Sequence, residues 1–325
     1  MRLAAATARR VWDRWRQVSP LDLEAGSALW LEDALEATRE GRARSRLLSG
    51  RYVRLLRGLR VGRTLPPLLP EPPRERVTIG ELRRDLLADS GEAPEVWPED
   101  DETVPVDDDF EWPEEDTEDA ERAATVSLVV TGPVRAQGYL DDLADDSRRG
   151  RLDDVSFLAE MDQMMRDAGA VAAGAAEREA LRGGRDLLDA ASRADRAVVG
   201  WARVTDGDPC WFCAMLASRG AVYRNFWTAR YTGRASRRRA APPDPPQGWE
   251  DWPPERMAEW EASRGMDRFH NNCHCTIVPV YSRTDWVPEA SQEFRNLYYA
   301  STRGLTGREA RAAFRAAIEA RRQQA

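Results

Sequence analysis

The sequence predicts a mainly α-helical protein with a helical N-terminal part, a small α+β domain built around a Cys/His cluster, and a helical C-terminal tail. Apolar residues recur at helical spacing in residues 1–60 and again in 152–199. All four cysteines and both histidines fall in two short clusters, near residues 210 and 270. The length of 325 residues, with 42% hydrophobic and 32% charged residues, allows two or three domains with at least one core.

Composition excludes several classes of function. The 48 basic residues are all arginine, so mechanisms that need a lysine, such as a Schiff base or a P-loop, are excluded. The net charge of −8 argues against a global basic field for nucleic acid. No apolar run is long enough to cross a membrane, and the arginine-rich start is unlike a secretory signal. Without export, we expect the cysteines to be metal ligands or free thiols rather than disulfides.

The first segment, residues 1–90, is predicted to be a helical domain. Its first helix reaches Val18, and further helices are expected over 21–48 and 51–59. Several prolines between residues 66 and 73 then end the helical pattern.

The second segment, residues 91–122, is predicted to be an acidic linker. The stretch from Glu92 to Glu121 contains no basic residue, which favours a disordered, solvated chain. Three aromatic residues keep open a second interpretation, an interaction segment for a basic partner; they are Trp97, Phe110 and Trp112.

The third segment, residues 123–285, is predicted to hold the α+β domain. Residues 124–130 are β-branched and apolar, which predicts a strand ended by Gly132-Pro133. Residues 152–199 predict helices with a break at Gly183-Gly184, and a methionine-rich stripe between 157 and 165 predicts a core face. Residues 233–266 have the composition of an inserted loop followed by a short helix.

The last segment, residues 286–325, is predicted to be a helical tail with a break near Gly304–Gly307. Phe314, Ala317 and Ile318 are expected to face a core.

The two clusters predict a metal site. Cys210 and Cys213 are separated by two residues, a spacing that lets both sulfurs reach one tetrahedral centre. The second cluster offers His270, Cys273 and Cys275, and an extended backbone would place these two cysteines on one face. His274 would then point away and is the weakest candidate. We therefore expect zinc, held at a structural site that joins two distant stretches of chain.

Other interpretations of the cysteines stay open. Cys210 and Cys213 could form a redox pair, although no thioredoxin-like βαβ pattern precedes them. Disulfides and buried free thiols are further alternatives.

The clusters resemble the domain of phage Mu F-type minor head proteins. The resemblance rests on Asp-Pro-Cys210-x-x-Cys213 and on His270-x-x-Cys273-x-Cys275 followed by Thr-Ile-Val-Pro279. Nearby stretches are similar to the actinobacterial phage branch, whose members are described as minor capsid proteins or capsid maturation proteases; these stretches are 184–186, 200–204, 213–220 and Tyr223. His274 departs from the pattern, because arginine is common there, and 233–266 is longer than usual.

The resemblance implies a role in head morphogenesis. The protein would act inside the procapsid near the portal, in contact with portal, major capsid or scaffold subunits, and would remain in the virion after assembly in the host cytoplasm. No membrane partner is expected.

Two alternatives to a structural role remain. A capsid maturation protease would need a nucleophile such as Ser218 or Cys213 beside His270. A head protein that contacts packaged DNA would use arginines, either Arg234 with 237–239 or the region 42–63 with Tyr52.

Overall fold

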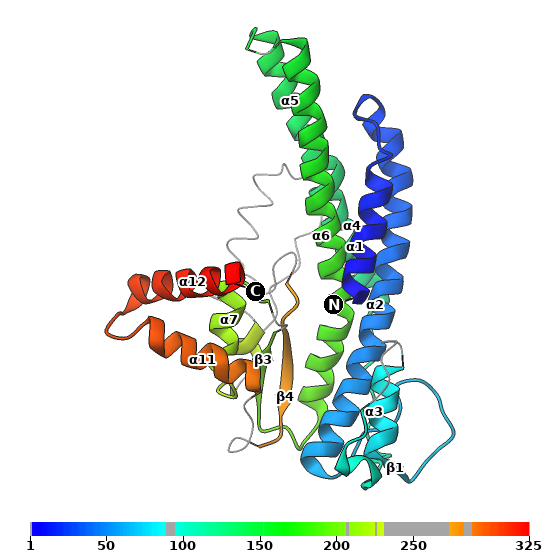
Figure 1. Ribbon diagram of the computed structural model, residues 1–325. Helices are drawn as coiled ribbons and strands as arrows, with labels where there is room; N and C mark the ends of the chain where they lie inside the picture. Colours follow the sequence, from blue (N-terminus) through cyan, green and yellow to red (C-terminus); the bar gives the residue numbers. More distant parts are fainter. Residues whose placement is uncertain are drawn as a thin grey trace. The chain divides into compact units, whose positions relative to one another are not determined.

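The computed structural model describes residues 2–88, 95–151, 153–205, 208–224, 226–230, 273–282 and 288–324, and it confirms the mainly helical fold (Figure 1). The chain divides into two compact units. The helical unit comprises Met1–Gly50 and Trp112–Leu187, and the cysteine unit comprises Arg51–Glu111 and Leu188–Ala325. Each unit combines two separate stretches of chain, whereas the sequence suggested four consecutive segments, 1–90, 91–122, 123–285 and 286–325. These four domain limits stay a prediction.

The helical unit is built from long helices around two tryptophans. It contains α1 (Arg2–Trp15) and α4 (Thr117–Val129), α5 (Arg135–Arg148), and most of α2 (Leu23–Val61) and α6 (Asp154–Ala194). The rings of Trp15 and Trp30 meet edge to face, with centroids 4.9 Å apart. The indole N–H of Trp15 donates to the carbonyl of Met165 over 2.7 Å. This bond satisfies a polar atom that burial would otherwise leave unpaired.

Two expected helix breaks are absent. The helices expected over 21–48 and 51–59 form one continuous helix, α2, and Gly183-Gly184 lies inside α6. A Cβ atom on Gly184 would lie 2.3 Å from Oγ of Ser49 in α2. The glycines therefore serve close packing of α2 against α6 and do not end a helix.

The strand expected over 124–130 is wrong, because these residues belong to helix α4 and to the π-helical turn η3 (Val130–Val134). Ala124 and Leu128 are buried four residues apart, on one helical face. Burial of that face outweighs the preference of the β-branched residues for a strand. The methionine-rich stripe is a core face only in part, since Met165 is buried but Leu158 is 58% exposed.

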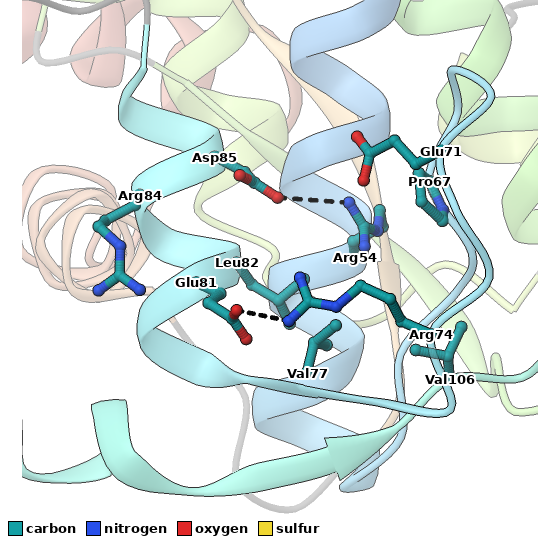
Figure 2. A pocket seen from close by; sticks show the side chains of 10 residues that line it. All are labelled: Arg54, Pro67, Glu71, Arg74, Val77, Glu81, Leu82, Arg84, Asp85 and Val106. Atoms are coloured by element: carbon teal, nitrogen blue, oxygen red, sulfur yellow. Dashed lines mark hydrogen bonds and ion pairs between the residues drawn. The ribbon is translucent and has the colours of Figure 1, made fainter.

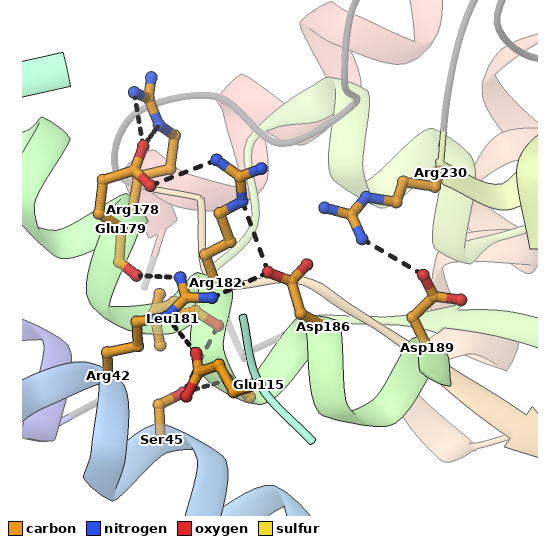
Figure 3. Close-up of polar contacts among 11 residues, drawn as sticks. Arg42, Ser45, Glu115, Arg178, Glu179, Leu181, Arg182, Asp186, Asp189 and Arg230 are labelled. Atoms are coloured by element: carbon orange, nitrogen blue, oxygen red, sulfur yellow. Dashed lines mark hydrogen bonds and ion pairs between the residues drawn. The ribbon is translucent and has the colours of Figure 1, made fainter. Parts of the chain in front are cut away.

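The acidic segment is folded over its described residues, 95–121, unlike the disordered linker expected. It contains η2 (Pro98–Asp101) and β2 (Thr103–Pro105), which pairs antiparallel with β1 (Arg76–Thr78). Its carboxylates pair with arginines from distant parts of the chain. In the helical unit, Arg42 contacts both Glu115 and Asp186 (Figure 3).

In the cysteine unit, Asp107 of the same acidic segment pairs with Arg57 and Arg63. Arg57 is itself buried and also pairs with Asp195 over 2.8 Å. The long-range arginine partners explain why a segment without basic residues is folded.

The N-terminal stretch of the cysteine unit forms a small packed lobe. Helix α3 (Ile79–Leu87) begins with a capping box between Thr78 and Glu81 and packs on the β1–β2 ribbon. Beside it lies a pocket of about 290 Å³, in which Asp85 pairs with Arg54 (Figure 2). None of its lining residues belongs to the cysteine clusters.

The C-terminal stretch confirms the expected helical tail. Helices α11 (Glu289–Ser301) and α12 (Gly307–Gln324) are separated by a turn that contains Gly304, and Phe314 and Ile318 are buried. None of the helices in the described part of the chain is both long and apolar enough to span a membrane.

Candidate metal centre

A short antiparallel ribbon positions the second cysteine cluster. Strand β3 (Gly200–Val204) pairs with β4 (Thr276–Val280), with Arg203 opposite Ile277. In an extended chain successive side chains alternate in direction, and the three residues before β4 alternate in burial in this way. Cys273 and Cys275 are accordingly buried, whereas His274 between them is exposed, as expected.

Helix α7 (Trp211–Ala217) positions the first cluster. Cys210 is its N-cap residue, and Sγ of Cys210 accepts a hydrogen bond from the backbone N–H of Cys213 over 3.4 Å. Cys213 lies in the first turn of the helix and is buried. The two-residue spacing thus places both sulfurs near the start of one helix.

The structure brings three of the four cysteines together. Sγ of Cys213 lies 3.5 Å from Sγ of Cys273 and 3.3 Å from that of Cys275, and the last two sulfurs are 3.0 Å apart. None of the four cysteines forms a disulfide. Sulfurs bound to one tetrahedral zinc at about 2.3 Å would be roughly 3.8 Å apart. These three buried cysteines therefore lie close enough to bind one metal ion.

A tetrahedral centre needs a fourth ligand besides this trio. The sulfurs of Cys213, Cys273 and Cys275 all lie within 4.8 Å of one another, and Cys210 is not part of this group. The sulfur of Cys210 contacts the backbone N–H of Cys213 instead. His270, the other candidate, lies outside the described residues. The assignment of Cys210, Cys213, His270, Cys273 and Cys275 as ligands stays a prediction, with Cys213, Cys273 and Cys275 as its geometric centre.

The surroundings of the sulfurs are apolar. Tyr223, Phe226, Ala229 and Ile277 pack around them as one buried cluster. Contacts with the Cys210, Cys273 and Cys275 side chains, together with burial, raise the pKa of the Cys213 thiol above its ordinary value. Several thiolates cannot gather in such a place without a positive charge, which a metal cation would supply.

A buried arginine supplies part of that charge. Arg203 of β3 is fully buried; its Nη2 donates to Sγ of Cys275 over 2.7 Å and its Nη1 to the carbonyl of Ala229 over 3.0 Å. Burial would lower the pKa of Arg203, but the sulfurs of Cys275, Cys213 and Cys273 raise it. The guanidinium therefore remains charged beside the three sulfurs.

Sequence reasoning gave Arg203 no role. The available signal was a charged residue inside a short apolar strand, between Ala202 and Val204. Such a residue is rarely buried without a charged or strongly polar partner.

The opposite side of α7 anchors the C-terminal helices. Ala214 and Ala217 pack against Phe294 of α11 and against Phe314 and Ile318 of α12. The helix that carries Cys213 is therefore held between the sulfur cluster and the α11–α12 hairpin. A change in the sulfur cluster that displaces α7 should therefore also disturb the packing of α11 and α12.

The family comparison covers this whole site. The sequence pattern of a family described as "VG15 protein" matches residues 113–301, which is more than half of the chain and includes all four cysteines. No curated protein and no solved structure matches the chain.

Proposed function

Because the chain belongs to the VG15 protein family, a family of phage or viral proteins, we propose that it is a minor capsid protein in head morphogenesis of a tailed bacteriophage. It would act inside the procapsid near the portal and remain in the virion. Portal, major capsid and scaffold subunits are its proposed partners.

The observation that carries this proposal is the buried trio of Cys213, Cys273 and Cys275 inside the family match. These residues occupy the motif that resembles the Mu F-type minor head proteins. If the motif matched by chance, contact between sulfurs about 60 residues apart in sequence would not be expected.

Zinc is the proposed ion, and its proposed role is structural. Cys213, Cys273 and Cys275 would hold it, with Cys210 or His270 as the fourth ligand. Four such ligands close the coordination sphere, so no position remains for a reactive water. When bound, zinc supplies a cross-link between α7 and the segment before β4, and its binding energy contributes directly to folding.

The maturation protease gains no support from the described residues. The hydroxyl of Ser218 donates to the carbonyl of Met215 over 2.8 Å, at the end of α7. Cys213 is the other nucleophile considered, and its sulfur lies against Cys273 and Cys275.

Quantitative mass spectrometry of procapsids and mature particles tests the proposal. We expect the chain in both, at far lower copy number than the major capsid protein, and cross-linked to the portal. A phage that encodes Cys213→Ser should assemble fewer filled heads, whereas Ser218→Ala should behave as wild type. Absence of the chain from both kinds of particle would exclude a capsid role.

A further inference from the structure

Helix α12 separates its apolar residues from its arginines. Its buried positions, Ala310, Phe314 and Ile318, follow one another at intervals of four. At about 100° per residue, four arginines fall together in an arc of roughly 60° beside this buried face. These residues, called the arginine row, are Arg308, Arg311, Arg315 and Arg322.

The arginine row is open to solvent. All four residues are exposed, and Arg308 and Arg311 form no ion pair within the described part of the chain. Arg315 pairs with Glu319 one turn away and Arg322 with Asp208, both at exposed positions. Such surface pairs contribute little and exchange easily for another anion.

The row contrasts with the arginines first considered for DNA contact. Arg42 and Arg57 of α2 are engaged by carboxylates of the same unit, and little of either side chain is exposed. Arg234 and 237–239 lie outside the described residues. Helix α12, by contrast, carries five arginines and two glutamates, in a chain whose net charge is −8.

We infer that the arginine row binds the phosphate backbone of double-stranded nucleic acid. The row is straight and spans about 21 Å at 1.5 Å per residue, so it can follow several successive phosphates. Guanidinium groups bind phosphate through paired hydrogen bonds. The inference rests on the proposed function, since a protein inside the head faces packaged DNA. Because the rest of the chain is acidic, the contact is local and independent of base sequence.

Fluorescence anisotropy of the full-length chain with a short labelled DNA duplex tests this inference. The logarithm of the binding constant falls with the logarithm of salt concentration by about 0.9 per phosphate contacted. We expect R308Q/R311Q to reduce this slope by about 1.8, which is two contacts. The control R219Q/R224Q makes the same change of charge at two other exposed arginines and should leave the slope unchanged.

Each outcome has a definite meaning. Equal slopes for wild type and R308Q/R311Q would overturn the inference, and so would an equal loss in the control. If the duplex does not bind but R308Q/R311Q loses its cross-links to portal, the row serves an acidic protein instead. The proposed function fails separately, by absence of the chain from particles.

Discussion

Replacing Arg203 with methionine removes a buried guanidinium from the sulfur cluster while keeping a long, unbranched side chain. In the structure this group is fully buried and donates to Sγ of Cys275 over 2.7 Å. The substitution therefore takes away one positive charge and the hydrogen bonds to Sγ of Cys275 and to the carbonyl of Ala229, with little change in packing volume. It should leave the ligands themselves in place.

The magnitude follows from two opposing effects. Two unit charges about 4 Å apart attract by roughly 4 kcal/mol at an effective dielectric constant of about 20. Burial of the guanidinium also has a desolvation cost, so the net contribution is smaller. Groups that hydrogen-bond to metal ligands typically change metal affinity about 10- to 100-fold. We therefore expect R203M to weaken zinc binding by about 1.4–2.8 kcal/mol.

Competition with a chromophoric chelator near neutral pH measures this change on the full-length protein. Arg203→Lys keeps the charge but loses the fork of donors, so its affinity should fall between wild type and R203M. Arg219→Met alters an exposed arginine and is the matched control. If R203M binds zinc as tightly as wild type, the guanidinium does not act on the centre.

Further predictions concern helix packing and an ion pair outside the metal centre. Gly184→Ala inserts a methyl group into the α2–α6 contact and should lower the free energy of unfolding in urea by about 1–3 kcal/mol. Gly138→Ala in helix α5 is the control, because its added methyl group would have no other atom within 4 Å. This variant should be neutral or slightly stabilising. Burial would raise the pKa of Asp107, but hydrogen bonds from Arg63 and Arg57 lower it below its ordinary value. A lowered pKa stabilises the fold above the unfolded-state pKa, about 3.9, and this stabilisation disappears as pH falls through the folded-state value. Asp107→Asn should thus be less stable than wild type near neutral pH, and the difference in stability should shrink below about pH 4. Urea unfolding of both proteins across this pH range measures the difference. If the difference does not depend on pH, the ion pair is not a source of acid sensitivity.

Much of the helical architecture could be predicted from periodic burial. The turn between α11 and α12 was predictable from Gly304, because glycine readily adopts a positive φ. In the structure its φ is 76°. The proximity of Cys273 and Cys275 followed from alternation in an extended chain. Their approach to Cys213 was predictable only by assuming a shared ion.

The errors have a common physical origin in long-range contacts. Glu115 was assigned to a disordered linker because its partner Arg42 is 73 residues away. Leu128 was assigned to a strand because the core that buries it comes from α1, α2 and α6. Arg203 was overlooked because its partner Cys275 is 72 residues away in sequence.

Metal analysis of the purified protein, combined with thiol titration, tests the metal-centred fold most directly. One zinc per chain is expected, with thiols that stay unreactive until a chelator removes the ion and α7 loses its anchorage. A folded, metal-free protein whose cysteines react freely, or one in which they are paired as disulfides, would contradict it.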